Sequence, residues 1–172
     1  HFDRVLTSVA PAGRLGAHNP PQDVLVPTNR RIFSLSGGKA RGRLIGGNLT
    51  LVQALIGTPY FPTLDGAILF LEDVDEDVYR VDRMLAHLRL AGALDRLAGV
   101  AIGRFSEMSR GGDGGALGFD EVLHTYFGSL GIPVAVGFPF GHIDDQWTLP
   151  VGVEAELDAD AGTLSLLEAA VR

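Results

Sequence analysis

The chain is organised around an apolar run that ends in two acids. Ala67 to Leu71 are five consecutive apolar residues, and Glu72 and Asp73 follow directly. A short continuous apolar run of this kind is typical of a strand buried on both faces of a sheet. Because open α/β folds place their functional sites beyond the ends of strands, we expect the two carboxylates to lie at the edge of a sheet.

A second turn of the same character follows later in the chain. The segment Phe138–His142 combines Pro139 and Gly141 with a histidine, directly after a strand-like run. Loops held by rigid strands are where functional side chains concentrate. If the fold brings the two edges together, Glu72 and His142 form a carboxylate–imidazole pair. Such a pair is two-thirds of a nucleophilic triad.

The composition indicates a globular chain of one domain with an appendage. It has 172 residues, of which 46% are hydrophobic and 20% charged, enough for a substantial core. No apolar run is long enough to span a membrane, and no signal-peptide pattern opens the chain. The sequence lacks cysteine, which excludes disulfides, thiolate zinc sites and a cysteine nucleophile. Since the chain begins with His1 and not Met, we expect a fragment of a longer protein.

The net charge of −7 is unevenly distributed. Residues 1–43 carry seven Lys or Arg against two Asp, whereas residues 44–172 carry seven against nineteen acidic residues. The acidic body argues against a nucleic-acid partner. The basic segment has two interpretations. It is a docking edge that binds another domain or an anionic ligand, or it is a solvated connector. Its cations are Arg30, Arg31, Lys39, Arg41 and Arg43.

The residue pattern predicts an α/β fold. Helical spacing of apolar residues predicts two main helices, Val78–Ala91 and Asp120–Leu130, and shorter helices over Leu49–Ile56 and His1–Ala10. Strands are predicted at Arg30–Leu35, Gly42–Ile45, Ala67–Leu71, Leu97–Phe105, Ile132–Val136, Thr148–Pro150, Val153–Leu157 and Thr163–Leu167. The last two are separated by a glycine-containing turn and predict a C-terminal β-hairpin.

A glycine pair precedes the first of the shorter internal helices. Gly46 and Gly47 are predicted to form a turn between a strand and the helix, and Asn48 is placed to cap that helix through its side-chain oxygen. Glycine permits a positive φ or a close backbone approach. Both a structural turn and a backbone segment that lines a ligand site remain open.

Other candidate sites are weaker. Asp73, Asp75 and Asp77 have the spacing of the first calcium ligands of an EF-hand loop, but Val78 and Met84 occupy its glycine and glutamate positions. No close spacing of His and acidic residues supports a metal site. None of the serines lies in G-x-S-x-G or a comparable strand-to-helix turn, so no serine of this sequence is a credible nucleophile.

Several motifs occur in an order that resembles a known family. They are Gly42–Thr50, Gly57–Tyr60, Gly66–Asp73, Tyr79–Leu85 and Gly137–His142. Together they resemble the C-terminal domain of the L,D-carboxypeptidases, a family of serine peptidases, over about Gly38 to Leu157. The resemblance implies a swivelling β/β/α-type domain with a mixed sheet over residues 38–172, preceded by an inter-domain connector or partial N-terminal element over residues 1–37.

The resemblance also implies the chemistry. The family uses a Ser–Glu–His triad built across two domains, and the positions that match its Glu and His are Glu72 and His142. The serine and the oxyanion hole belong to an N-terminal domain that this chain lacks. Gly46, Gly47 and Asn48 are expected to contact substrate. No cofactor, metal, nucleic acid or membrane is implied.

The implied reaction is release of terminal D-alanine from murein tetrapeptide during cytoplasmic peptidoglycan recycling. The expected partners are the serine-bearing domain and the murein peptide. A homodimer is a further expectation, in which a second copy of this chain covers the face that otherwise meets the serine-bearing domain. One alternative is the microcin-immunity branch, which cleaves acyl-sulfamoyl adenylates and usually stacks adenine on an aromatic residue; Trp147 is the sole Trp. The other alternative is a non-catalytic binding or dimerisation module.

Overall fold

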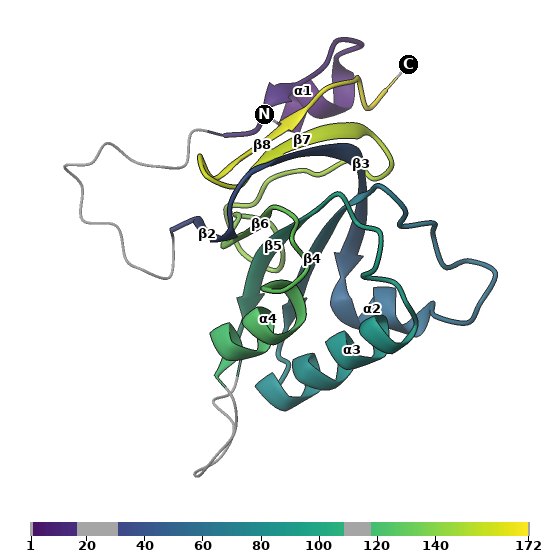
Figure 1. Cartoon of the computed structure of the whole chain (residues 1–172). Coiled ribbons are helices and arrows are strands. Elements are labelled where there is room, and N and C mark those ends of the chain that lie inside the picture. The colour runs from purple at the N-terminus through teal and green to yellow at the C-terminus, as the bar shows by residue number, and fades with distance from the viewer. Residues whose placement is uncertain (1, 17–30, 109–117, 172) are drawn as a thin grey trace.

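The computed structural model describes residues 2–16, 31–108 and 118–171. They form one mixed eight-stranded sheet, in the order β1-β8-β7-β3-β4-β5-β6-β2, with four helices (Figure 1). The strands are β1 (Gly13–Arg14), β2 (Phe33–Ser36), β3 (Lys39–Asn48), β4 (Ile68–Val74), β5 (Gly99–Ser106), β6 (Val134–Val136), β7 (Glu154–Asp158) and β8 (Thr163–Leu166). The helices are α1 (Phe2–Thr7), α2 (Leu49–Ala54), α3 (Val78–Leu90) and α4 (Phe119–Phe127). The predicted α/β class, mixed sheet, two main helices and C-terminal hairpin are confirmed.

Strand β3 belongs to both halves of the sheet. Its first half, residues 39–43, pairs antiparallel with β7, and its second half, residues 44–48, pairs parallel with β4. Figure 1 shows β3 curving from the β7–β8 hairpin down to the helical layer. The change of partner falls beside Gly42, where a Cβ atom would collide with the carbonyl oxygen of Gly66. A side chain at position 42 would therefore push the two chain segments apart.

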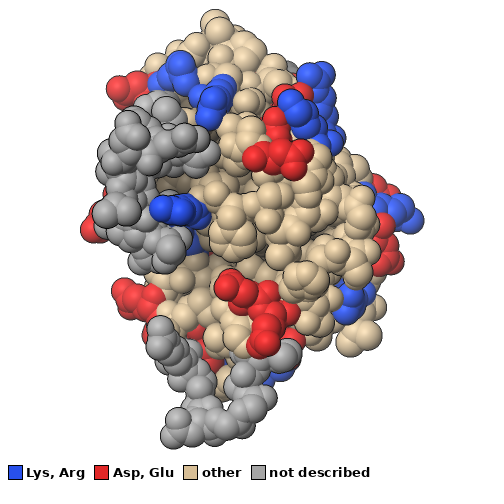
Figure 2. All heavy atoms as spheres, turned by 60° about the vertical axis from the view of Figure 1, so that its left-hand side comes forward, with Lys and Arg blue, Asp and Glu red and all other residues tan. Residues whose placement is uncertain are grey.

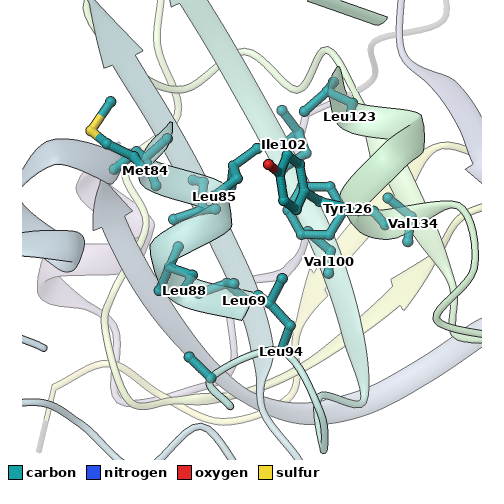
Figure 3. Packing of buried hydrophobic residues seen from close by; sticks show 14 of the residues in the cluster. Leu69, Met84, Leu85, Leu88, Leu94, Val100, Ile102, Leu123, Tyr126 and Val134 are labelled. Carbon is teal, nitrogen blue, oxygen red and sulfur yellow. The ribbon is translucent and has the colours of Figure 1, made fainter. Parts of the chain in front are cut away.

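The core lies on both faces of the sheet. On the helical face, side chains of β4, β5 and β6 pack against α3 and α4, as Figure 3 shows for Leu69, Val100 and Ile102 beneath Leu85 and Tyr126. On the other face, a second cluster joins β3, β4, β7 and β8 to aromatic side chains from residues 138–147. The sheet is thus buried on both sides, which explains the long apolar runs in its parallel strands.

The alternation of side chains along β4 sets the direction of its two acids. Leu69 and Leu71 belong to the helical-face cluster, whereas Ile68 and Phe70 belong to the opposite cluster. Successive side chains of a strand point to opposite faces. Glu72 therefore shares the face of Phe70, and Asp73 shares the face of the helices. The predicted buried strand is confirmed, but it continues through both acids to Val74.

Some predicted elements differ from the structure. The glycine turn before α2 is wrong, because β3 continues through Gly46 and Gly47 to Asn48. The predicted strand at residues 148–150 is also wrong: this segment has no strand pairing. The N-terminal helix is shorter than predicted and runs from Phe2 to Thr7. His1 and Arg30, which lie in two of the predicted elements, are outside the described residues.

The described parts of residues 1–37 pack onto the rest of the chain. Strand β1 pairs with β8, and β2 pairs with β6. Val5 and Leu15 are buried in the second core cluster. The small, glycine-containing β1 carries no period-two apolar pattern, so the sequence gives no sign of this pairing.

Two cations of the basic segment have partners within the domain. Lys39 lies 2.8 Å from Asp158, and Arg41 lies 2.6 Å from Glu156 across β3 and β7. The pKa of Asp158 is lowered mainly by the hydrogen bond that it accepts from Lys39. On the face shown in Figure 2, the described Lys and Arg side chains are scattered among Asp and Glu, not gathered in one patch. Within the described residues, no helix is long and apolar enough to cross a bilayer.

A buried tyrosine couples α4 to α3 and makes stability depend on alkaline pH. Tyr126 is buried and donates a 2.7 Å hydrogen bond to Asp82. Burial and the Asp82 carboxylate raise the pKa of Tyr126 from 10 to about 12. Because the pKa of Tyr126 is raised in the folded state, its protonated hydroxyl contributes its full stabilisation below pH 10. This contribution is lost as the pH rises through about 12.

We expect urea unfolding of the chain to show this loss, on the order of 2 kcal/mol between those pH values. Tyr126→Phe removes the titrating hydroxyl, so its stability profile should be flatter over the same interval. The exposed Tyr60, replaced by Phe, is the matched control. Equal alkaline profiles for the Tyr126 variant and the unchanged chain would contradict the assignment.

Candidate active site

Glu72 and His142 meet at the end of β4. His142 Nδ1 lies 2.8 Å from Glu72 Oε2, so the contact predicted from the sequence is present. The Glu72 side chain is 10% exposed and the His142 side chain is 55% exposed. A nearly buried carboxylate thus holds one nitrogen of a ring that is open to solvent, which leaves Nε2 for chemistry with a substrate or a nucleophile.

A β-bulge lies opposite Glu72. Leu71 pairs with Ile102, whereas Asp73 pairs with Phe105, so the two residues Gly103 and Arg104 of β5 face Glu72 alone. Bulges redirect side chains and are common next to active sites. Here the bulge receives the His142 turn: the Arg104 N–H donates to the Phe140 carbonyl at 2.9 Å. A Cβ at Gly103 would collide with Phe140, so glycine makes room for that docking.

Gly141 lets the main chain cross directly over Glu72. It has φ of +121°, a conformation that side chains rarely adopt. A Cβ at this position would lie 2.9 Å from both Glu72 Oε2 and the Arg104 carbonyl oxygen. The positive φ and the lack of room for a Cβ atom therefore both require glycine at position 141, in the turn predicted over Phe138–His142. It brings His142 onto the carboxylate.

A cavity of about 520 Å³ opens beside the pair. Glu72 and His142 line it together with Gly47, and the buried rings of Phe70 and Phe140 also contribute to its wall. The cavity is thus polar where the pair lies and apolar beside it, a composition suited to an organic ligand of moderate size. Of the three residues predicted to contact substrate, Gly47 lines this cavity, whereas Gly46 and Asn48 are outside its lining.

Gly46 and Asn48 have structural contacts. A Cβ at Gly46 would collide with the Phe70 carbonyl, so this glycine permits close packing of β3 on β4. The predicted cap is confirmed, since Asn48 Oδ1 accepts the Leu51 N–H at 3.2 Å. Its Nδ2 donates to Asp73 at 2.7 Å. Direct contact of either residue with substrate stays a prediction.

Asp73 is a buried carboxylate for which the sequence reasoning found no role. It is 3% exposed and accepts hydrogen bonds from Asn48 Nδ2, Val74 N–H, Thr50 N–H and Thr50 Oγ1, all between 2.7 and 2.9 Å. These bonds satisfy the charge and tie the start of α2 to the end of β4. The alternation along β4 was the available signal, because it places Asp73 on the helical face.

The described residues offer no group of three or more His, Asp or Glu that could hold a metal ion. We therefore assign none of the described residues a metal-binding role. The chemistry of the site is derived from the carboxylate, the imidazole and the cavity beside them.

Known proteins share this fold and this segment. Residues 41–157 match the family described as LD-carboxypeptidase C-terminal domain. A Synechocystis protein named "Putative carboxypeptidase slr1534" is 48% identical over 130 residues, which are 76% of this chain and 43% of that protein. The crystal structure of muramoyltetrapeptide carboxypeptidase from Oxalobacter formigenes matches with a TM-score of 0.73 and 36% identity, over 96% of this chain and 52% of that one.

A second kind of relative is also similar. The Escherichia coli microcin C7 self-immunity protein MccF is 32% identical over 132 residues, which are 76% of this chain and 38% of that protein. Its structure in complex with aspartyl sulfamoyl adenosine matches with a TM-score of 0.82 and 26% identity, over 99% of this chain and 55% of that one. This chain thus spans about half the length of the relatives it matches.

The fold and the matched segment together define a carboxypeptidase-type domain. The chain belongs to the LD-carboxypeptidase C-terminal domain family, and the match covers the strands that carry Glu72 and the turn that carries His142.

Proposed function

We propose that this domain supplies the general base and its orienting acid to a serine L,D-carboxypeptidase. The observation that carries the proposal is the 2.8 Å contact between His142 Nδ1 and Glu72 Oε2 in the wall of a cavity. A carboxylate bound to one imidazole nitrogen fixes the tautomer in which the other nitrogen accepts a proton. The nucleophilic serine and the oxyanion hole belong to a second domain of the same protein, consistent with the half-length coverage of the relatives.

The reaction then follows the triad scheme. His142 Nε2 accepts the serine hydroxyl proton as the oxygen attacks the scissile carbonyl, and Glu72 stabilises the imidazolium that forms. His142 next donates this proton to the leaving amine, and the acyl-enzyme remains. Water attacks the acyl group with His142 again as the base, which releases the shortened peptide and regenerates the serine.

We propose murein tetrapeptide as the substrate and D-alanine as the leaving group, in cytoplasmic peptidoglycan recycling. The name of the Oxalobacter relative supports this choice. The competing substrate class is an acyl-sulfamoyl adenylate, as in the complex of MccF. The sequence places no aromatic residue for stacking adenine; the sole Trp, Trp147, is 6% exposed and packs against Phe138 with ring centroids 5.8 Å apart. Because Trp147 also lines the cavity, the choice of the peptide rests on the names of the relatives.

The test is release of D-alanine from murein tetrapeptide by the purified chain, with and without the serine-bearing domain added in trans, taken as the part of the Oxalobacter relative that this chain does not cover. We expect no release by the chain alone, because a base and its acid cannot replace the nucleophile and the oxyanion hole. Release should appear when the serine-bearing domain is added. A control addition of that domain with its serine replaced by alanine should give none.

Three results would contradict the proposal. Release by the chain alone, abolished by His142→Ala, would place a nucleophile in this sequence. Hydrolysis of aspartyl sulfamoyl adenosine but not of the tetrapeptide, in the same complemented mixture, would favour the microcin-immunity reaction. Binding of the serine-bearing domain without hydrolysis of either substrate would favour a non-catalytic module, and self-association in its place would indicate a homodimer.

A further inference from the structure

We propose that Ser106 is a positioning residue for His142, and this proposal rests on the role of His142 given above. The Ser106 hydroxyl donates a hydrogen bond to the main-chain carbonyl oxygen of His142 at 3.1 Å. The two residues are 36 positions apart in the chain. Ser106 therefore joins the end of β5 directly to the residue that bears the imidazole.

Ser106 is itself held firmly. It pairs with Val74 at the end of the β4–β5 ladder, and its carbonyl oxygen accepts the Asp75 N–H at 3.0 Å. The same end of β5 carries the bulge, where the Arg104 N–H holds the Phe140 carbonyl. Two hydrogen bonds from β5 thus fix the main chain at Phe140, two residues before His142, and at His142 itself.

The side chain of His142 needs this support because its surroundings are open. More than half of the side chain is exposed, and the ring is held by one hydrogen bond to Glu72. With the main chain fixed by Ser106 and the ring fixed by Glu72, His142 is held at two points. Without the Ser106 bond, the main chain at His142 loses one of its two anchors on β5, and the ring can move away from Glu72.

The direction of this bond separates positioning from nucleophilic catalysis. The Ser106 hydroxyl is bonded to the main-chain oxygen of His142. A nucleophilic serine would instead present its hydroxyl to the imidazole. The geometry therefore assigns Ser106 to the support of the base and leaves the nucleophile to the second domain.

The test uses the whole 172-residue chain and follows the Nδ1–H proton of His142 by NMR. Ser106→Ala is expected to raise the rate at which this proton exchanges with water by about fivefold, the effect of losing one neutral hydrogen bond. Ser106→Thr keeps the hydroxyl and should restore the slow rate. The exposed Ser129, replaced by Ala, is the matched control and should leave the rate unchanged.

A second measurement uses the complemented enzyme, that is, this chain mixed with the serine-bearing domain. Ser106→Ala should lower kcat for D-alanine release by about fivefold and leave KM unchanged, and Ser106→Thr should recover kcat. An unchanged exchange rate in Ser106→Ala would overturn the proposal, as would failure of Ser106→Thr to restore it. Because the exchange measurement needs no catalysis, it tests Ser106 even if the tetrapeptide proves not to be the substrate.

Discussion

His142→Ala is expected to lower kcat for D-alanine release by about 10⁴-fold or more in the complemented enzyme, since loss of a triad base has effects of this size. The fold should persist, because more than half of the His142 side chain is exposed. Glu72→Gln keeps the shape and a hydrogen-bonding group next to Nδ1 but removes the charge that stabilises the imidazolium. We expect a loss of up to about 10⁴-fold from this change.

Single-turnover rates with murein tetrapeptide would check these values. His124→Ala is the matched control, because His124 is an exposed histidine on α4 and has no contact with Glu72. Urea unfolding of each variant separates loss of chemistry from loss of fold. A rate for His142→Ala close to that of the unchanged enzyme would remove the residue from the mechanism.

Gly46→Ala is expected to cost about 3 kcal/mol or more of the free energy of unfolding. Gly46 has φ of +148°, so alanine adds backbone strain, and its Cβ would also collide with the Phe70 carbonyl on β4. The neighbouring Gly47 provides a matched control. It has a similar φ of +145°, but a Cβ there has no neighbour within 4 Å. Gly47→Ala should therefore cost the strain alone, about 1–2 kcal/mol.

Urea denaturation of the two variants, followed by circular dichroism, gives the difference. Equal losses of stability would show that backbone strain alone decides the cost and that the close approach of β3 to β4 is unimportant. Because Gly47 lines the cavity, Gly47→Ala has a second use. If Gly47 contacts substrate, this variant should raise KM in the complemented enzyme although its fold is retained.

The sequence was informative where one residue pattern dominates. The apolar run before Glu72 predicted β4, and helical periodicity predicted α3 and α4 within a few residues. The meeting of Glu72 with His142 rested on the motif resemblance, since nothing in local periodicity joins residues 70 positions apart. The same holds for the hydrogen bond from Ser106, which directly follows the predicted strand Leu97–Phe105 and lies in none of the motifs.

Other features depend on tertiary contacts that no local pattern encodes. The Gly46–Gly47 pair has the composition of a turn, but both residues remain in β3 because β4 supplies backbone partners on one side. The bulge opposite Glu72 arises from a mismatch in register between two strands. Thr148–Pro150 has β-favouring residues but pairs with no strand in the part of the chain that the structure describes, and its Leu149 lines the cavity next to Trp147.

The shared strand β3 has a consequence for how the domain opens. Its residues 39–43 hold the β7–β8 hairpin, and its residues 44–48 hold β4 and end beside the cavity. Partial unfolding of either half of the sheet must therefore disrupt the pairing of a continuous ten-residue strand. The other half of the sheet depends on the same strand. We therefore expect the hairpin and the site to open as a single cooperative unit. Amide exchange near Gly47 should then depend in part on the pairing at the far end of the same strand.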